Sequence, residues 1–163
     1  MTLYIVRHGV AVLRGTAGTV DDERPLTPEG RAKMARAAKG LTKLLSSPTI
    51  IFTSPLPRAQ QTAMLIAKAF RAEEKVEVIK ELSPGGSTKA ILGVLSNQRP
   101  NAEVVLVGHE PDLGYLASYL LGLDAPVIEF KKGAVCAIKM KAIGKGKGTL
   151  VWHLQPRQLR HIS

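Results

Sequence analysis

The stretch Met1-Thr2-Leu3-Tyr4-Ile5-Val6-Arg7-His8-Gly9 opens the chain, and its apolar run predicts a buried strand from Leu3 to Arg7. Arg7 and His8 stand at the carboxyl end of this strand, and Gly9 begins the turn that follows. Buried strands rarely end in two adjacent cations unless an anion lies beside them. We therefore expect the end of the first strand to line an anion-binding site.

Beyond this strand the chain alternates helical and strand patterns. After a loop over residues 10–26, the patterns predict helices at 28–46, 58–70, 88–96, 112–121 and 156–162, and strands at 49–53, 76–79, 103–107, 127–130, 134–140 and 149–154. In the first helix, Ala32, Ala35, Leu41 and Leu44 are expected to form the buried stripe. This order predicts an α/β fold in three layers: a mostly parallel central sheet, helices on both faces, and an antiparallel edge made by the last strands.

Length and composition predict one domain over residues 1–163. Apolar residues make up 45% of the chain and charged residues 22%, which is typical of globular proteins. The lone cysteine, Cys136, lies in an apolar stretch and is expected in the core; it excludes an intrachain disulfide, and no zinc-type cysteine spacing occurs. We find no signal-peptide pattern and no apolar run of about 20 residues, so we expect a cytoplasmic protein that does not enter the membrane.

The net charge of +10 is concentrated near the carboxyl terminus. Residues 131–163 hold eight Lys and Arg residues and no Asp or Glu, whereas residues 1–130 carry a net charge of only +2. Such a region is either a solvated surface that aids solubility or a source of positive potential that attracts an acidic partner or a phosphorylated ligand. In the second interpretation, Lys131, Lys132, Lys145 and Lys147 would help to dock an acidic phosphoprotein.

Two further strand ends carry residues that strand formation does not explain. Arg58 falls in the first turn of the helix after the second strand, where a cation opposes the helix dipole, and His109 follows the fourth strand. Taken singly, Arg58 could be a surface residue and His109 a structural histidine. Carboxyl ends of parallel strands meet at one edge of the sheet, however, and two arginines with two histidines would repel one another there without an anion. We therefore predict one anion site built from Arg7, His8, Arg58 and His109.

Three segments carry a resemblance to a known family. Arg7-His8-Gly9, Ser54-Pro55-Leu56-Pro57-Arg58-Ala59-Gln60-Gln61-Thr62 and Gly108-His109-Glu110-Pro111 resemble the signatures of the histidine phosphatase superfamily, also called phosphoglycerate mutase-like. The run Arg24-Pro25-Leu26-Thr27-Pro28-Glu29-Gly30, the short chain and the missing helical lid resemble its SixA-type phosphohistidine phosphatases. The resemblance implies a phosphoglycerate mutase-like fold in a single domain without a lid insertion.

The resemblance also implies a mechanism. His8 would attack phosphorus and become a phosphohistidine that water hydrolyses, while Arg7, Arg58 and His109 hold the phosphoryl oxygens, with no metal and no cofactor. These residue types suit that chemistry, because a neutral imidazole is a nucleophile near pH 7 and guanidinium groups bind phosphate oxygens in pairs. We also expect Gly9 to matter because a Cβ there would obstruct the phosphate.

The expected proton donor is missing from its usual places. Related enzymes carry a Glu two residues after the histidine and an Asn further on, where this chain has Val10 and Arg14, and a general acid near the position of Pro84. The remaining candidates are Glu81 and the loop acids Asp21, Asp22 and Glu23, of which we favour Glu81 and Asp22; a solvated rim is the other interpretation of the loop acids. A site with a weak acid should favour phosphoramidates or activated esters, whose leaving groups need less help.

The sequence is compatible with three functions. The first is hydrolysis of phosphohistidine on a protein, and the alternative is a phosphomonoesterase of broad specificity for small phosphorylated molecules. The third is a basic nucleic-acid-binding module. Only 4% of the residues are aromatic, and the basic region lacks the interleaved aromatic residues on which single strands stack, so a nucleic-acid partner is the least expected.

Overall fold

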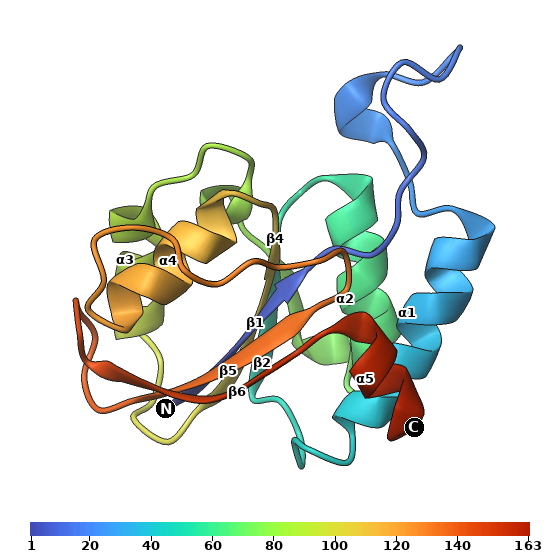
Figure 1. The fold of residues 1–163 in the computed structure, drawn as a ribbon. Helices are drawn as coiled ribbons and strands as arrows, with labels where there is room; N and C mark the ends of the chain where they lie inside the picture. The colour runs from blue at the N-terminus through green and yellow to red at the C-terminus, as the bar shows by residue number, and fades with distance from the viewer.

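The computed structural model describes residues 1–163 and is built on one six-stranded sheet with the strand order β3-β2-β4-β1-β5-β6 (Figure 1). The strands are β1 (Thr2–Arg7), β2 (Ile50–Thr53), β3 (Val76–Val78), β4 (Glu103–Gly108), β5 (Val135–Met140) and β6 (Gly148–Leu154). The first four strands pair in parallel, while β5 runs antiparallel to β1 and β6 antiparallel to β5. The predicted parallel sheet with an antiparallel edge is therefore confirmed.

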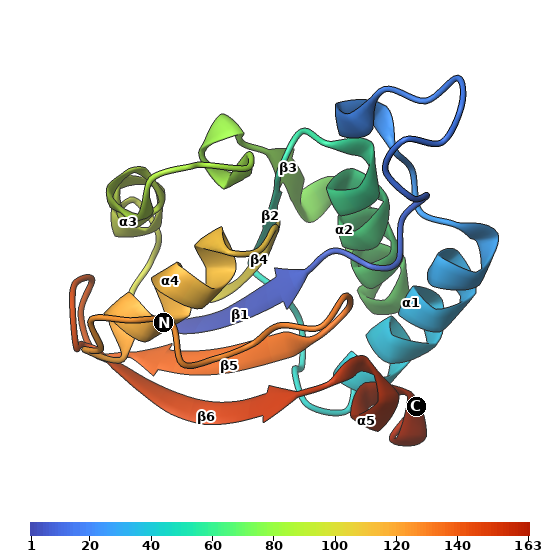
Figure 2. The ribbon, with the colours of Figure 1, turned by 45° about the horizontal axis from the view of Figure 1, so that its top comes forward.

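Five helices cover the two faces of the sheet. They are α1 (Pro28–Leu41), α2 (Pro57–Phe70), α3 (Thr88–Ser96), α4 (Asp112–Leu120) and α5 (Pro156–His161). One core of 17 buried residues lies under α1, α2 and α5, and a second of 19 lies under α3 and α4 (Figure 2). Because each face of the sheet has its own apolar core, the predicted three-layer arrangement is confirmed.

The register of the central strands determines where the candidate residues lie. In the parallel pair β1 and β4, Arg7 lies opposite Gly108, so His8 and His109 are the next residues beyond the same edge of the sheet. The His8 N–H donates to the Gly108 carbonyl at 3.2 Å, which extends the pairing by one step. Both strands are buried along their apolar lengths, and the hydrogen-bond ladder therefore brings the two histidines together.

Three details of the fold differ from our predictions. Helix α1 ends at Leu41 and does not continue to residue 46. The buried face of α1 is formed by Met34, Ala37, Ala38 and Leu41, at the spacing i, i+3, i+4, i+7, whereas Ala32, Ala35 and Leu44 are exposed and only Leu41 of the predicted stripe is buried.

Residues 127–130 form no strand, although their sequence is typical of one. Their backbone N–H groups bond to side chains instead of a neighbouring strand: Val127 donates to Ser118 Oγ at 3.0 Å, and Phe130 donates to Glu110 Oε1 at 2.9 Å. The Phe130 ring is fully buried, so the apolar pattern reflects burial without strand pairing.

Cys136 lies in β5 and is fully buried, as predicted. Burial raises the pKa of its thiol to about 12, so the thiol stays protonated near neutral pH. None of the five helices combines the length and the apolar character that crossing a membrane requires.

Gly30 lets the loop that follows His8 pack against the start of α1. A Cβ at position 30 would lie 2.1 Å from the Val10 carbonyl oxygen, which already accepts the Thr27 N–H at 3.0 Å. We expect Gly30→Ala to lower the free energy of unfolding by about 1–3 kcal/mol, because backbone must move to make room. Urea denaturation measures this effect.

Gly93→Ala is the matched control. A Cβ at this position in α3 meets nothing within 4 Å, so the substitution should raise the free energy of unfolding by about 0.5–1 kcal/mol. Equal stability of both variants would contradict the assignment.

Candidate active site

A pocket of about 380 Å³ opens at the carboxyl ends of β1 and β4, beside the first turn of α2. The structure brings all four predicted residues, Arg7, His8, Arg58 and His109, into its lining. The remaining lining residues are Leu13, Arg14, Arg24, Pro84, Glu110 and Lys132. Five Arg and Lys side chains therefore face one pocket with a single carboxylate among them, which is the composition of an anion site.

His8 is almost completely buried, and its ring orientation is set by the backbone. Its Nδ1 lies 2.7 Å from the Gly9 carbonyl oxygen. Because a carbonyl only accepts, Nδ1 carries the ring proton and Nε2 keeps its lone pair. The adjoining turn is also held: the Gly9 N–H donates to Thr62 Oγ1 at 3.0 Å, and the Thr62 hydroxyl donates to the Arg58 carbonyl at 2.7 Å. Thr62 thus couples the turn after His8 to the helix that carries Arg58.

Gly9 has a different role from the one we predicted. A Cβ at this position would lie 3.2 Å from Leu26 Cδ2 and 3.6 Å from Met34 Cβ. The missing side chain therefore makes room for the loop and for α1, and Gly9 does not line the active-site pocket.

His109 is held by Ser54, a residue of the second motif. Its Nε2 lies 2.8 Å from Ser54 Oγ, and the same oxygen accepts the Leu56 N–H at 3.2 Å. Ser54 thus fixes the orientation of the His109 ring. The His8 and His109 ring centroids are 5.2 Å apart, so the two rings lie close together in the lining of the pocket.

Each of the two central arginines keeps part of its guanidinium group free for a ligand. Arg7 Nη1 donates to the Phe130 carbonyl at 2.6 Å, and Arg58 Nη1 donates to the Asp21 carbonyl at 3.3 Å. The Nε atoms of both residues are buried and have no acceptor in the protein. These Nε atoms are closed off from solvent, so a ligand in the pocket would meet the Nη2 groups, which make no hydrogen bond within the protein.

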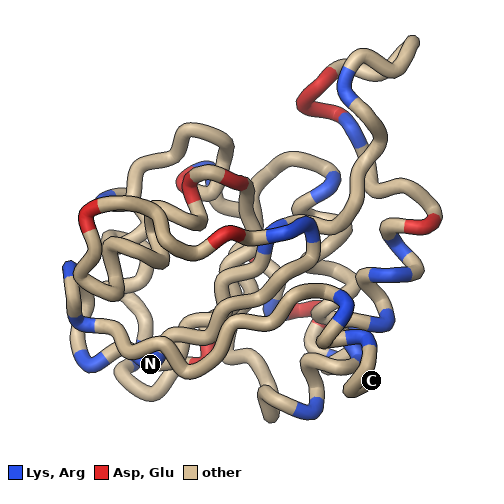
Figure 3. Tube along the Cα trace, viewed as in Figure 1, with Lys and Arg blue, Asp and Glu red and all other residues tan.

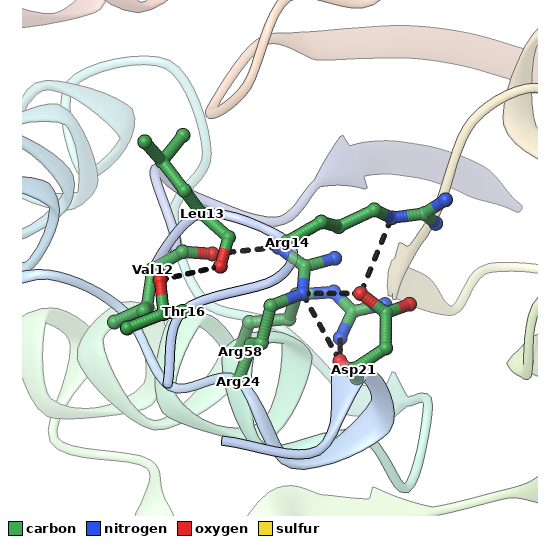
Figure 4. A network of polar contacts seen from close by, with 7 residues as sticks. All are labelled: Val12, Leu13, Arg14, Thr16, Asp21, Arg24 and Arg58. Atoms are coloured by element: carbon green, nitrogen blue, oxygen red, sulfur yellow. Dashed lines mark hydrogen bonds and ion pairs between the residues drawn. The ribbon is translucent and has the colours of Figure 1, made fainter. Parts of the chain in front are cut away.

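The loop after His8 is attached to the pocket through Asp21 (Figure 4). The Asp21 carboxylate contacts Arg24 Nε at 2.8 Å and Arg14 Nε at 3.2 Å, and its carbonyl accepts from Arg58. Arg24 also donates to the Val12 carbonyl at 2.7 Å and is only 8% exposed. One carboxylate and its backbone therefore hold three arginines around the loop. We did not predict Arg14, Arg24 or Lys132 as site residues; Arg24 could have been noticed within the Arg24–Gly30 run.

The candidate proton donors lie in different surroundings. Neither Glu81 nor Asp22 lines the pocket, whereas Pro84 does. Glu110 is the one carboxylate in the lining, and both of its oxygens accept backbone N–H groups, from Gly114 at 3.2 Å and from Phe130 at 2.9 Å. Since both oxygens are occupied by backbone donors, Glu110 is suited to hold Phe130 against the start of α4 rather than to donate a proton.

Burial and the neighbouring cations lower the pKa values of both histidines. The pKa of His8 falls to about 3, mainly through burial and further through His109, Arg58 and Arg7, while the bond to Gly9 opposes the shift. The pKa of His109 falls to about 4, again mainly through burial and then through Arg58, Arg7 and Arg24. Both rings are therefore neutral at pH 7, and the His8 Nε2 lone pair is available for reaction.

These shifts predict how the two rings titrate. We expect neither His8 nor His109 to gain a proton between pH 8 and 5, whereas an ordinary histidine titrates near 6.5. Since the unfolded chain binds protons below about pH 6.5 and the folded chain does not until lower pH, the free energy of unfolding should fall as pH drops below that value. NMR of the ring protons measures the first effect, and urea denaturation at pH 7 and 5 measures the second. A midpoint near pH 6.5 for either ring would contradict the prediction.

A family model and two related proteins match the sequence of this chain. Residues 3–84 match the family model of the histidine phosphatase superfamily, branch 1. The chain is 29% identical over 163 residues to the phosphohistidine phosphatase SixA of Escherichia coli strain K12, covering 98% of this chain and 97% of that protein. It is 37% identical over 145 residues to an uncharacterized protein of Picosynechococcus sp., covering 87% of each.

Solved structures show the same likeness. The protein histidine phosphatase SixA complexed with tungstate superposes with a TM-score of 0.86 at 28% identity, covering 98% of this chain and 99% of that chain. The putative phosphohistidine phosphatase SixA from Agrobacterium tumefaciens shares the fold, with a TM-score of 0.79 at 22% identity, covering 95% of this chain and 97% of that chain.

Proposed function

The chain belongs to the histidine phosphatase superfamily and is a phosphatase, and we propose that it hydrolyses phosphohistidine on a protein through a covalent intermediate at His8. The observation that carries this proposal is the contact of His8 Nδ1 with the Gly9 carbonyl at 2.7 Å. It leaves the Nε2 lone pair free beside Arg7, Arg58 and His109, which line the same pocket. A neutral, oriented imidazole among cations is the arrangement that nucleophilic attack on a phosphoryl group requires.

The reaction has two steps. His8 Nε2 forms a bond to phosphorus while the bond from phosphorus to the leaving nitrogen breaks. The leaving imidazole, already protonated from solvent on its other nitrogen, keeps the electron pair and departs neutral. A water molecule then attacks the phosphorus of the intermediate, its proton passes to solvent, and orthophosphate is released as the bond to Nε2 breaks. His8 returns to its neutral state with the proton still on Nδ1.

Charge on the transferred group is stabilised by groups already in place. Arg7 and Arg58 are anchored through Nη1 to backbone carbonyls, and their Nη2 groups make no hydrogen bond within the protein. We propose that the ring of His109, which lines the same pocket, supplies a third donor. Because a phosphoryl group in transfer spreads its charge over three oxygens, positioned donors of this kind supply most of the catalysis. We propose that these side chains provide the charge stabilisation without a metal ion; no three His, Cys, Asp or Glu side chains come together as metal ligands.

The surroundings of the leaving group favour a nitrogen over an alkyl oxygen. Glu110, the one acid in the lining, is bonded through both oxygens to backbone N–H groups, and Glu81 and Asp22 lie outside the lining. An alkoxide depends on a general acid, whereas an imidazole protonated on its other nitrogen leaves easily. The similarity to a protein named phosphohistidine phosphatase supports the same substrate.

Access to the pocket suits a protein substrate. We propose that residues 1–163 form one domain without a helical lid, because the segments around the pocket are the loop 10–26, the turn at Pro84 and the turn at Lys132. A phosphohistidine on another protein can then reach His8 from solvent. The volume of about 380 Å³ also admits a small phosphorylated molecule, which keeps a broad phosphomonoesterase as the alternative.

A substrate panel separates the two functions. We expect kcat/KM for a phosphohistidine peptide to exceed that for the same peptide carrying phosphoserine by at least ~10²-fold, which is the usual contribution of a general acid that an alkyl leaving group would lack. An aryl phosphate serves as the control, since its leaving group also needs little protonation and should be hydrolysed. Hydrolysis of phosphoserine and phosphohistidine peptides at similar rates would favour the phosphomonoesterase.

A further inference from the structure

A second pocket, of about 190 Å³, adjoins the active-site pocket and shares Lys132 with it. We call it the side pocket. Its walls come from the Gly9–Val10 segment, α1, α5 and the turn before β5, and its cations are Lys33, Lys132 and Arg160. Apolar surface between these cations is provided by Met34, Ala37 and Pro156, and no Asp or Glu lines it. The side pocket therefore combines positive charge with an apolar floor.

Few carboxylates of the protein lie close enough to neutralise the cations of the side pocket. No carboxylate lies within 4.0 Å of Lys132 or Arg160, and Lys33 pairs only with Glu29 on the exposed surface of α1. Burial, and after it the nearby Arg7, Arg24 and Arg58, lowers the pKa of Lys132. The positive potential of the active site thus continues into the side pocket.

The basic region of the chain divides between the two ends of the sheet. Because β5 and β6 run antiparallel, with Val135 opposite Leu154 and Met140 opposite Gly148, Lys131, Lys132 and α5 lie at the end that carries His8. Lys141, Lys145 and Lys147 surround the β5–β6 turn at the opposite end, where Lys145 pairs with Asp124 (Figure 3). Of the four lysines expected to dock a partner, only Lys131 and Lys132 are therefore near the site.

We propose that the side pocket binds a carboxylate side chain of the phosphorylated protein, at a position close in sequence to its phosphohistidine; this rests on the function proposed above. A glutamate fits both parts of the lining, because its methylene groups can lie on Met34 and Pro156 while its carboxylate meets Lys33 and Arg160. Lys132 lies between the two pockets, so a phosphoryl group at His8 and a carboxylate in the side pocket can belong to one short segment.

A nucleic acid fits this site less well. No aromatic side chain lines the side pocket, so unpaired bases would find no surface for stacking. The positive groups also gather around one small pocket of about 190 Å³ instead of forming a track for a phosphate backbone. An acidic protein segment is the partner that both features favour.

Two peptides test the proposal. Both carry one phosphohistidine; in the first it is flanked on both sides by glutamates, and in the second by glutamines. We expect the wild-type protein to hydrolyse the glutamate peptide with a kcat/KM about fivefold higher, through KM, as partly exposed charge pairs allow. In Lys33→Gln/Arg160→Gln this preference should fall to about one, with the rate on free phosphohistidine unchanged.

The matched control is Lys141→Gln/Lys147→Gln, which removes the same charge at the other end of the sheet and should keep the preference. No preference in the wild type, or the same preference in Lys33→Gln/Arg160→Gln, would overturn the side-pocket assignment while leaving the proposed function intact. Failure to hydrolyse free phosphohistidine and both peptides would instead remove the proposed function and this inference with it. A short single-stranded DNA that inhibits the wild type but not Arg160→Gln would assign the pocket to nucleic acid.

Discussion

His8→Ala is expected to abolish turnover, lowering kcat by roughly 10⁴-fold or more on a phosphohistidine peptide, because no other group can form the covalent intermediate. The folded structure should survive, since His8 contributes one hydrogen bond to Gly9 and its neutral ring is replaced by a smaller side chain. Rapid quenching with a labelled substrate should trap phosphate on the wild-type protein that is labile in acid and stable in alkali. The variant should carry none.

His161→Ala is the control for this experiment, because His161 is an exposed residue at the end of α5. It should retain both turnover and the trapped label. Acid-labile phosphate on the His8→Ala protein would refute His8 as the nucleophile. Peptide mapping would then identify the histidine that carries the label.

Arg58→Ala should give the second largest loss, about 10²–10³-fold in kcat, which is the usual cost of removing one positioned donor for a developing oxyanion. Arg58 is only 3% exposed, and its Nη1 is anchored to the Asp21 carbonyl at 3.3 Å. In the alanine variant, a water molecule cannot take over the remaining N–H donors of Arg58 at the same positions, because nothing would anchor it as the Asp21 carbonyl anchors the guanidinium group. Arg58→Lys should recover only part of the loss, because an ammonium group cannot bind two oxygens side by side.

Steady-state kinetics and calorimetric titration with orthophosphate measure these effects together. Both Arg58 variants should bind orthophosphate more weakly than the wild type, and Lys68→Ala, at the far end of the same helix, should match the wild type in both measurements. Arg58→Ala with unchanged orthophosphate affinity and unchanged kcat would show that this guanidinium group does not touch the phosphoryl group.

The strands and the convergence of the four site residues could be predicted because both depend on local pattern and chain order. The runs Leu3–Val6 and Val104–Val107 are apolar enough to require central positions, and parallel strands bring their carboxyl ends to one edge. Arg7, His8, Arg58 and His109 then share a pocket whatever the details of the loops. Family resemblance adds the roles of these residues, which spacing alone does not supply.

Features that depend on long-range contacts could not be predicted in this way. Arg24 joins the site because the loop folds back so that its side chain reaches Asp21 and Val12, and nothing in the local sequence determines that path. Phe130 looks like a strand residue because it is buried, yet its N–H bonds to Glu110 from another segment. Likewise, the basic region reads as one block in the sequence, and only the antiparallel pairing of β5 and β6 divides it between two ends.

The guanidinium groups of Arg7 and Arg58, which line the active-site pocket, have a consequence for the product as well as for the substrate. Orthophosphate carries the same oxygens as the group in transfer, so donors that hold the phosphoryl group would also hold the ion that is released. Each cycle would then end by breaking those contacts. We therefore expect accumulated orthophosphate to compete with the next substrate and to slow turnover.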